Sequence, residues 1–339
     1  NVGHCHPEVI KALKEQIDNY LHIMPFGEYK QEPQEKLASR LIGLLPANIE
    51  KVFLVNSGTE AIEGAIKLAK RYTEKTDVIS MKNSYHGSLM SDEERKRKFR
   101  PLIPATDSIH INDHQKLDRI NKNTACVIIE PIQGDAGVRI PNPSYLKALR
   151  NKCNETGTLL IFDEIQTGFG RTGKMFAYEH TGVLPDIITL AKGMGGGMPI
   201  GAFAASENIM KTLSFDPILG HITTFGGNPV SCAAASASIN VIIKEKLCEN
   251  ADKMGDVFRE KLRNMFLKNV RGKGLMIAFD LKDHNTVRNL VEKCYEKGLL
   301  LFWFLSSPGS VRIYPPLTIN EEEVQKSCKI LENALKEIH

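Results

Sequence analysis

The sequence predicts an α/β protein with a mostly parallel central sheet, helices on both faces of that sheet, and a smaller α+β domain towards the C-terminal end. Two observations lead to this prediction. Between residues 35 and 245, short apolar runs alternate with longer runs of helical spacing, which is typical of parallel strands joined by crossover helices. After residue 246 the alternation ends, and long charged helical runs enclose short extended pieces. We therefore expect three parts, at residues 1–34, 35–245 and 246–339.

Each expected element depends on a local pattern of apolar residues. Short apolar runs predict strands at residues 52–55, 78–81, 125–129, 158–162, 186–191 and 200–205. Apolar residues three or four positions apart predict helices at residues 33–45, 60–72, 143–153 and 229–244. In the C-terminal part, the same criteria predict helices at 249–267, 286–297 and 320–338, a strand at 275–280, and extended pieces at 299–302 and 311–313.

The composition argues against several classes of protein. Of the 339 residues, 42% are hydrophobic and 25% are charged, which is ordinary for a globular chain with a large core. A net charge of +4 is too small to predict a nucleic-acid partner, and residues 92–98, which carry both signs of charge, are expected to be a solvated surface segment. No apolar run approaches the roughly 18 residues that a membrane span needs, so we expect no membrane partner. Seven scattered cysteines, an odd number, predict reduced thiols and a cytoplasmic location.

Residues 158–201 contain the most informative pair of side chains. One apolar run ends at Asp163, and a second ends at Lys192, which is followed by five glycines within nine residues. A carboxylate and an amine at the carboxyl ends of two buried strands are what pyridoxal phosphate (PLP) chemistry requires. The amine holds the cofactor aldehyde as a Schiff base, and the carboxylate keeps the pyridine nitrogen protonated. This pair predicts PLP as the cofactor.

Three glycine-containing segments suggest binding of a phosphate or nucleotide, and each has a simpler interpretation. Ser57, Gly58 and Thr59 open a helix, where free amides bind phosphate, yet taken alone they favour an ordinary helix cap. Residues 222–229 either add donors to a phosphate or cap the next helix. Residues 168–173 fit G-x-G-x-x-G, but no apolar helix opens there, so we expect an irregular loop and no dinucleotide site.

Three further segments carry side chains with two interpretations. Tyr85, after a strand, either stacks on a flat cofactor or is an ordinary loop aromatic. Residues 3–7, Gly-His-Cys-His-Pro, contain metal-type ligands, but no second pair lies at zinc-site spacing and Pro7 starts a helix. A capping turn is therefore favoured, and no metal site is expected. Arg312 lies in an extended apolar segment and requires a carboxylate from the substrate or from the protein itself.

Together, these segments resemble the class III (subgroup II) PLP-dependent aminotransferases, in particular the acetylornithine, ornithine and 4-aminobutyrate aminotransferases. Nine motifs occur in the order of that family and span residues 3–317. They are GHCHP, NSGTEA, YHG, EPIQGDAGV, FDEIQTGFGRTG, LAKGMGGGMPIGA, TTFGGNP, VRGKG and VRIYPPL. The resemblance implies PLP-dependent transferase fold type I. In that fold, residues 1–34 would belong to small-domain and dimer contacts, 35–245 to a large PLP-binding domain, and 246–339 to a small domain.

The resemblance also implies roles for individual residues. Lys192 would hold the cofactor as an aldimine and then act as the general base, and Asp163 would pair with the ring nitrogen. The other cofactor-binding candidates are Ser57, Gly58 and Thr59 at the phosphate, Tyr85 and Ile165 on the ring faces, Gln166 at the ring oxygen, and His86 and Glu130. Thr224 would reach the phosphate of the other subunit in a homodimer with shared active sites.

The substrate-binding candidates are Arg312, Asp135 and Ser88. Arg312 would meet a substrate carboxylate or an acidic gate, for which Glu130 and Asp135 are the candidates. Ser88 stands where ornithine-type relatives typically carry Arg, and Asp135 stands where they carry the longer Glu. The resemblance implies transfer of an amino group from an ω-amino or diamino acid, such as acetylornithine, ornithine or 4-aminobutyrate. The acceptor would be a 2-oxo acid such as 2-oxoglutarate, with ping-pong kinetics.

Two alternative functions are compatible with the same residues. A PLP-dependent aminomutase, racemase or decarboxylase would share the fold and the cofactor. A nucleotide-binding protein without PLP would use the glycine-rich loops, and the spacing of Asp163 and Lys192 would then be coincidental.

Overall fold

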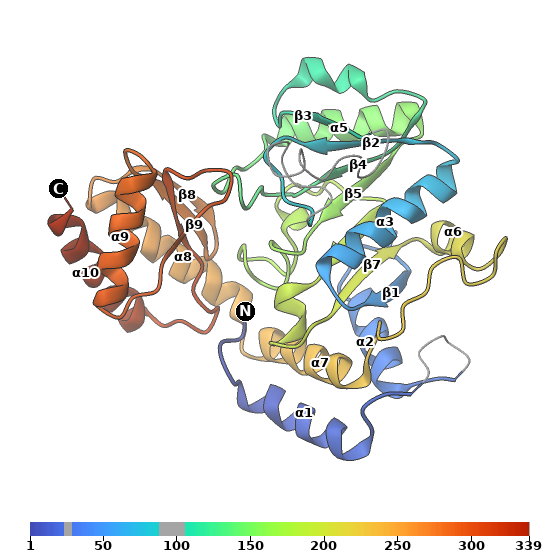
Figure 1. The fold of residues 1–339 in the computed structure, drawn as a ribbon, viewed down its shortest axis with the longest axis horizontal. Coiled ribbons are helices and arrows are strands. Elements are labelled where there is room, and N and C mark those ends of the chain that lie inside the picture. Colours follow the sequence, from blue (N-terminus) through green and yellow to red (C-terminus); the bar gives the residue numbers. More distant parts are fainter. Residues whose placement is uncertain (24–28, 88–105, 339) are drawn as a thin grey trace.

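The structure is a computed structural model, and it describes residues 1–23, 29–87 and 106–338. Figure 1 shows two unequal parts side by side: a large sheet with helices on both faces, and a smaller sheet with its own helices at the C-terminal end. The predicted fold class, with a mostly parallel central sheet and a smaller second domain, is confirmed.

The large sheet has the spatial strand order β1, β7, β6, β5, β4, β2, β3. Strands β2 to β6 pair in parallel, while β7 lies antiparallel between β6 and β1. The strands are β1 (Lys51–Val55), β2 (Asp77–Met81), β3 (Thr106–Ile109), β4 (Thr124–Ile129), β5 (Leu159–Asp163), β6 (Ile187–Leu190) and β7 (Gly201–Ala205). Because helices cover both faces, the central strands are buried along their whole length, and they are therefore apolar runs without alternation.

Alternate residues of these strands face two different layers of helices. The face that includes Ile161 packs against α3 (Gly58–Thr73), which lies in front of the sheet in Figure 1. The face that includes Phe162 packs against α5 (Pro143–Thr156). On that same side, α2 (Glu32–Ile42) and α7 (Pro229–Lys244) cover β6 and β7. Helix α3 begins two residues before the predicted helix, so its first turn reaches Gly58.

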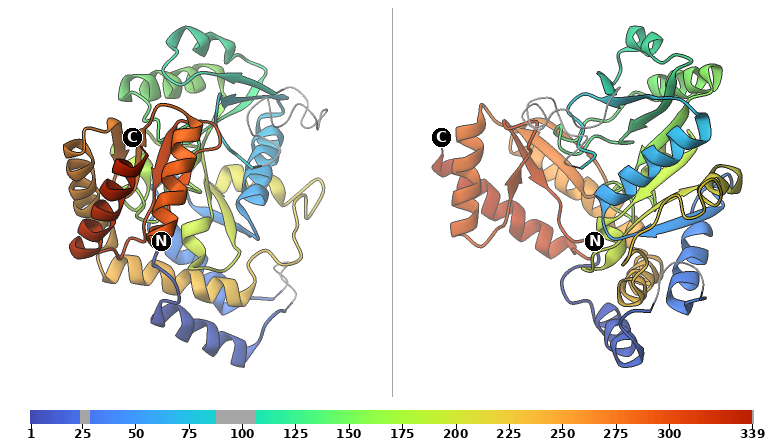
Figure 2. Two further views of the ribbon diagram at one scale, coloured as in Figure 1. Left: turned by 60° about the vertical axis from the view of Figure 1, so that its left-hand side comes forward. Right: turned by 45° about the vertical axis from the view of Figure 1, so that its right-hand side comes forward.

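The N-terminal helix α1 (Pro7–Asn19) packs against α7 below the sheet (Figures 1 and 2). His6 caps α1, since its Nδ1 accepts the Glu8 backbone N–H at 3.3 Å, so the predicted capping turn is confirmed. Within the described residues there is no cluster of metal-type ligands and no helix able to cross a membrane. The remaining short elements of the large part are α6 (Glu207–Met210) and the 3₁₀ turns η3 (His114–Arg119), η4 (Ala177–His180), η5 (Lys192–Gly195) and η6 (Lys211–Leu213).

The C-terminal part is an antiparallel sheet in the order β10, β11, β9, β8 with three helices. Its elements are α8 (Leu247–Asn264), β8 (Lys268–Lys273), β9 (Met276–Asp280), α9 (His284–Glu296), β10 (Phe302–Trp303), β11 (Ser310–Ile313) and α10 (Glu321–Glu337). Two expectations were wrong here. The helix expected at 249–267 ends at Asn264, and the following residues form the unpredicted strand β8, whose polar sequence has no apolar run. The extended piece expected at 299–302 is the shorter strand β10, which begins three residues later and ends one residue later.

Residues 168–173 form the predicted irregular loop, and the dinucleotide interpretation is excluded. Gly170 and Gly173 have φ of +89°, and a side chain at Gly173 would approach Asp252 Oδ1 of α8 to 2.9 Å. The Arg171 carbonyl accepts the Leu275 N–H at 3.0 Å. The loop therefore makes close contact with the C-terminal part and has no room for a nucleotide there.

A small apolar cluster also joins the two parts. Ile132 and Val138, from the loop after β4, pack with Met276, Ala278 and Phe304 of the smaller domain. Val138 is fully buried with φ of +54°, a left-handed conformation that a β-branched residue rarely adopts. The packing of both parts around this loop maintains the strained conformation.

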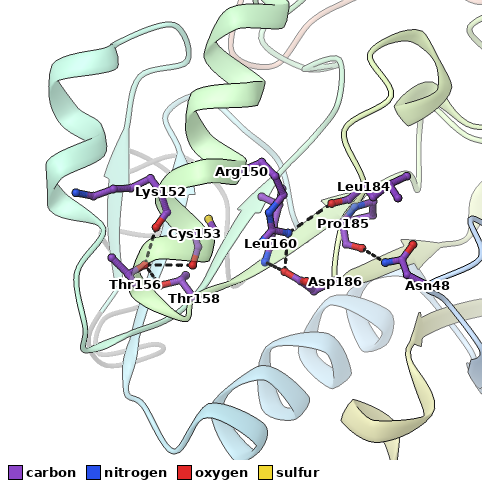
Figure 3. Close-up of polar contacts among 10 residues, drawn as sticks. All are labelled: Asn48, Arg150, Lys152, Cys153, Thr156, Thr158, Leu160, Leu184, Pro185 and Asp186. Atoms are coloured by element: carbon purple, nitrogen blue, oxygen red, sulfur yellow. Dashed lines mark hydrogen bonds and ion pairs between the residues drawn. The ribbon is translucent and has the colours of Figure 1, made fainter.

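Polar contacts near the amino ends of β5 and β6 hold these two strands in register (Figure 3). Asp186, just before β6, accepts hydrogen bonds from the Leu160 N–H of β5 and from Arg150 of α5, both at 2.7 Å. The Leu160 carbonyl in turn accepts the Asp186 N–H at 2.9 Å. Because these contacts fix the start of both strands, they also fix where the strands end, at Asp163 and just before Lys192.

Candidate active site

A cavity of about 350 Å³ lies where strands of the large sheet end and where α3 begins. Most of the residues that the sequence predicted for a cofactor site line this cavity: Ser57, Gly58, Thr59, Tyr85, Glu130, Asp135, Asp163, Ile165, Gln166 and Lys192. Lining residues that sequence reasoning missed are Asn56, Gly87, Ala191, Met198, Pro199 and Ile200. Asn56, Gly87 and Ala191 are immediate neighbours of predicted residues, so proximity along the chain could have identified them, whereas Met198, Pro199 and Ile200 lie at the end of the glycine-rich loop that follows Lys192.

The turn from β1 into α3 forms an anion cradle. Ser57 caps the helix, since its Oγ accepts the Glu60 N–H at 3.2 Å. The Glu60 carboxylate accepts from the Asn56 N–H and side-chain amide at 2.8 and 2.9 Å, which locks the turn. The Gly58 and Thr59 amides belong to the same first turn, whose N–H groups have no acceptor inside a helix and attract phosphate.

Gly87 brings the loop after β2 close to this cradle. Its φ is +82°, and a Cβ there would lie 2.8 Å from Thr59 Oγ1, so any larger residue would displace the loop. The adjacent Tyr85 lines the cavity and is half-buried. An aromatic ring and an anion cradle therefore lie at one end of the same cavity.

Asp163 lies at the end of β5 and has three hydrogen-bond donors around its carboxylate. Oδ1 accepts from the Ile165 N–H at 3.0 Å and from Thr189 Oγ1 at 3.4 Å, and Oδ2 lies 2.7 Å from His86 Nδ1. Both Asp163 and His86 are buried. Burial alone would lower the pKa of His86, but the hydrogen bond and charge of Asp163, with the charge of Glu130, raise it. His86 Nδ1 thus supports a carboxylate that faces the cavity.

Glu130, at the end of β4, is a second buried carboxyl group. Its Oε1 accepts the Gly134 N–H at 3.2 Å, whereas Oε2 has no partner among the described residues. Burial raises the pKa of Glu130 to about 7, and the charge of His86 and the Gly134 N–H oppose this shift only in part. Glu130 therefore titrates near neutral pH, close to the Asp163–His86 pair.

Lys192 follows β6 and faces the cavity from the 3₁₀ turn η5. It has φ of +44°, a left-handed conformation that is uncommon outside glycine and is associated with functional sites. Helix α7 supports the turn, since Ser238 Oγ donates to the Gly193 carbonyl at 3.4 Å. Lys192 is exposed, and its ammonium makes no hydrogen bond or ion pair with other residues in the described ranges. The amine is therefore available to react with a ligand.

Arg312 of β11 approaches the cavity from the smaller domain. Its NH1 lies 3.9 Å from Asp135 Oδ1, so the predicted acidic neighbour is Asp135. The guanidinium also lies over three aromatic rings, at 5.1 Å from Phe302, 5.9 Å from Phe304 and 5.3 Å from Tyr314. Cation–π attraction holds the group without a tight ion pair, which leaves its N–H donors available for an incoming carboxylate.

One candidate lies elsewhere, and another is not described by the structure. Thr224 is exposed on the turn before α7 and is not among the residues that line the cavity of its own chain. Ser88 lies outside the described residues.

These features fit PLP, whose site requires an anion cradle, an acceptor for a protonated ring nitrogen, and an amine. The cradle at Ser57–Thr59, the Asp163 carboxylate and the Lys192 amine all border one cavity, and Tyr85 and Ile165 line it between them. Two buried polar atoms without partners in the described chain, His86 Nε2 and Glu130 Oε2, lie close to the same site.

Comparison with known proteins gives one consistent family. The model of the class-III aminotransferases matches residues 1–335. The acetylornithine aminotransferase of Methanocaldococcus jannaschii is 41% identical, and the alignment covers 100% of this chain and 87% of that protein. Among solved structures, the ornithine aminotransferase of Toxoplasma gondii has a TM-score of 0.91 at 31% identity, covering 99% and 82% of the two chains. A PLP-bound amine transaminase from an uncultivated Pseudomonas species has a TM-score of 0.93 at 28% identity, covering 100% and 88%.

Proposed function

We propose a specific reaction for this chain from one premise: it belongs to the class-III aminotransferase family. It is therefore an aminotransferase that uses PLP and acts on amino acids. We propose that its amino donor is an ω-amino or diamino acid, with N-acetylornithine first and ornithine and 4-aminobutyrate next. We propose that its acceptor is a 2-oxo acid such as 2-oxoglutarate. The names of relatives about 40% identical to this chain, acetylornithine aminotransferases, support the first choice of donor.

The observation that supports this reaction best is the placement of Asp163 and Lys192 at one cavity beside the anion cradle. When bound, PLP supplies an aldehyde that reacts with amines and a ring that accepts electrons. In this proposal, Lys192 Nζ would take a proton from the donor carbon that carries the amine and pass it to the former aldehyde carbon of the cofactor, so that the amine stays with the cofactor. Asp163 Oδ accepts the hydrogen bond of a protonated ring nitrogen, and His86 keeps that carboxylate in place.

Other residues would orient the cofactor and the substrate. Ser57, Gly58 and Thr59 would bind the phosphate, Tyr85 and Ile165 would flank the ring, and Gln166 would bind the ring oxygen. Arg312 would release Asp135 and bind a substrate carboxylate in its place. Glu130 would hold a proton near the Asp163–His86 pair, since its pKa lies at about 7.

We further propose a ping-pong reaction in two halves. The donor leaves as an aldehyde or ketone after giving up its amine, and the 2-oxo acid then becomes the corresponding amino acid at the same site. With 2-oxoglutarate as the acceptor, the second product is glutamate.

A donor panel tests the proposed substrate. Purified protein with PLP and 2-oxoglutarate is given N-acetylornithine, ornithine, lysine, 4-aminobutyrate or β-alanine, and glutamate formation is measured. We expect the highest kcat/KM with N-acetylornithine. A clear preference for 4-aminobutyrate or β-alanine would contradict this donor while leaving the aminotransferase activity in place.

We propose that the protein works as a homodimer with shared active sites. Thr224 would reach the phosphate in the partner's site, and the exposed apolar side chains of Leu21, Ile222 and Phe225 around it support such a contact, with exposed fractions of 59%, 54% and 54%. Analytical ultracentrifugation should give twice the chain mass. The Thr224→Ala variant should keep that mass and lose affinity for PLP.

Two smaller proposals complete the description. The three parts at residues 1–34, 35–245 and 246–339 serve as a segment for small-domain and dimer contacts, a PLP-binding domain and a small domain. A cytoplasmic location agrees with seven unpaired cysteines.

A further inference from the structure

Tyr314 makes a contact that none of the roles above requires. It directly follows β11, and its hydroxyl donates to Gln166 Oε1, on the loop after β5, at 3.4 Å. Burial raises the pKa of Tyr314, so the hydroxyl keeps its proton and acts as a donor. One side chain of the smaller domain is thus hydrogen-bonded to a residue that lines the cofactor cavity.

The position of Gln166 depends on this contact and on an adjacent glycine. A Cβ at Gly134 would lie 1.5 Å from Gln166 Oε1, so the amide lies in space that only glycine leaves free. The hydroxyl proton of Tyr314 needs an acceptor, and Oε1 provides it. The Nε2 group, which carries two N–H donors, remains for a hydrogen bond to a ligand.

The ring of Tyr314 is held by two arginines. The Arg312 guanidinium lies 5.3 Å from the ring centre, and the Arg171 guanidinium lies 5.8 Å from it. Arg171 is buried and also donates to the Pro315 carbonyl at 2.7 Å, which fixes the backbone next to Tyr314. Among the described residues, Arg312 makes no comparable short hydrogen bond. Its ion pair with Asp135 is long, at 3.9 Å, so Arg312 is the more movable of the two arginines.

We propose that Tyr314 is a positioning residue that couples a carboxylate bound at Arg312 to the cofactor ring through Gln166. This inference rests on the proposed roles of Arg312 and Gln166. The 3.4 Å contact is longer than the 2.5–3.0 Å usual for O–H···O bonds, so it is weak before a ligand binds. A carboxylate that moves Arg312 also moves the ring stacked on it. The hydroxyl then approaches Oε1 and holds the Gln166 N–H groups on the ring oxygen.

Coupling of this kind is reciprocal, so it can be measured without turnover. Glutarate, a dicarboxylate with no amine or oxo group to react, serves as the probe. Its dissociation constant is measured by calorimetry on PLP-loaded protein and on protein freed of PLP, and the ratio of the two constants reports the coupling. The Tyr314→Phe variant keeps the ring and loses only the hydroxyl. We expect this variant to change the ratio by about two- to ten-fold, the value of one ordinary hydrogen bond.

A matched control separates this role from general packing. Tyr145 is a buried tyrosine whose hydroxyl, like that of the half-buried Tyr314, donates to a carbonyl oxygen at 3.4 Å, that of His110, outside the site. The Tyr145→Phe variant should therefore leave the glutarate ratio at its wild-type value. Thermal unfolding of both variants checks that each remains folded.

A second substitution identifies the route. In a Gln166→Met background the acceptor is absent, so Tyr314→Phe should have no further effect on the ratio. An unchanged ratio in Tyr314→Phe, an equal change in Tyr145→Phe, or additive effects with Gln166→Met would each overturn the inference. A separate result tests the proposed function: if glutarate binds the Arg312→Gln variant as tightly as wild type, the carboxylate role of Arg312 fails and the coupling fails with it.

Discussion

The cavity has two sides that are built in different ways. One side, which we call the floor, consists of Ser57–Thr59, Asp163 and Lys192, and it comes from strand ends and one helix start of the large sheet. The other side, which we call the wall, forms where the two parts of the chain meet: Asp135 and Gln166 line the cavity, and Arg312 and Tyr314 of the smaller domain contact them from behind. The Asp163 carboxylate of the floor is held by contacts as short as 2.7 Å, to His86, and 3.0 Å, to the Ile165 N–H, whereas the wall contacts are 3.4 and 3.9 Å.

This difference suggests a division of work. A floor built on strand ends, a helix start and the buried Asp163 suits a cofactor that remains in place through both halves of a reaction. A wall held by aromatic stacking and long polar contacts suits a surface that must accept two different substrates in turn. We therefore expect floor substitutions to affect chemistry and wall substitutions to affect substrate affinity.

The largest effect should come from Lys192→Ala. Loss of the amine removes both the attachment point and the base, so kcat should fall by at least about 10⁴-fold. Glutamate formation measures the activity, and circular dichroism checks the fold. Substantial residual activity would mean that another group provides the base, which would contradict the assignment of Lys192 to the floor.

Asp163→Asn should have the next largest effect. The variant keeps the shape of the side chain but loses the charge that supports a protonated ring nitrogen, so kcat should fall by about 10²- to 10³-fold. Single-turnover kinetics with N-acetylornithine give the rate of the first half-reaction. The glutarate dissociation constant should remain unchanged, because Arg312 and Asp135 are intact. A large change in glutarate affinity would show that floor and wall are not separate.

Glu130 also lines the cavity, and its titration should make the stability of the folded protein depend on pH. Its pKa is raised from a usual value of 4.5 to about 7, so the folded protein binds its proton more tightly than the unfolded chain does. The contribution of this proton to the stability of the folded protein is complete below pH 4.5 and is lost as the pH rises through 7.

The Glu130→Gln variant keeps an acceptor for the Gly134 N–H and carries no charge. At pH 8 it should be more stable than wild type by on the order of 3 kcal/mol, and near pH 4 the two should be alike. Urea unfolding of PLP-free protein across this pH range measures the difference. A constant difference at every pH would exclude titration of Glu130 as the cause.

Arg312→Gln should have a smaller effect, confined to the wall. Loss of a charge-assisted bond to the substrate carboxylate should raise the KM for N-acetylornithine by about 10- to 100-fold and leave kcat within about two-fold. Arg288→Gln on the exposed face of α9 is the matched control, since Arg288 forms an ion pair with Glu292 on the same helix. If kcat and kcat/KM of Arg312→Gln fell equally, Arg312 would act in the chemical step and not in substrate binding, which would contradict its assignment to the wall.

The floor and the wall also differed in how far the sequence could predict them. Asp163, Lys192 and Ser57–Thr59 lie where an apolar strand gives way to a turn or a helix, and such boundaries are visible locally. The contact between Gln166 and Tyr314 joins residues 148 positions apart, and no periodic pattern predicts it. The roles of the floor residues and of Thr224 stay predictions, as does that of Ser88.

The fold shows the same division between local and long-range information. The buried strands β4, β5 and β6 were predicted within a few residues because their apolar runs are continuous. Strands β3 and β8 were missed, because Thr-Asp-Ser-Ile and Lys-Asn-Val-Arg-Gly-Lys carry too few apolar residues. Each lies at the edge of its sheet as formed by the described residues, and polar residues cost little at such an edge.

The apolar cluster around Val138 has a consequence for synthesis of the chain on the ribosome. Ile132 and Val138 emerge long before Met276, Ala278 and Phe304, the residues that cover them. Until the last part of the chain is made, the side chains of Ile132 and Val138 lack the apolar partners that cover them in the folded protein, and the loop has only local hydrogen bonds such as that from the Val138 N–H to the Gly134 carbonyl. The nascent large domain therefore carries an uncovered apolar segment. The contacts of Arg312 with Asp135 and of Tyr314 with Gln166 also form only after translation is nearly complete.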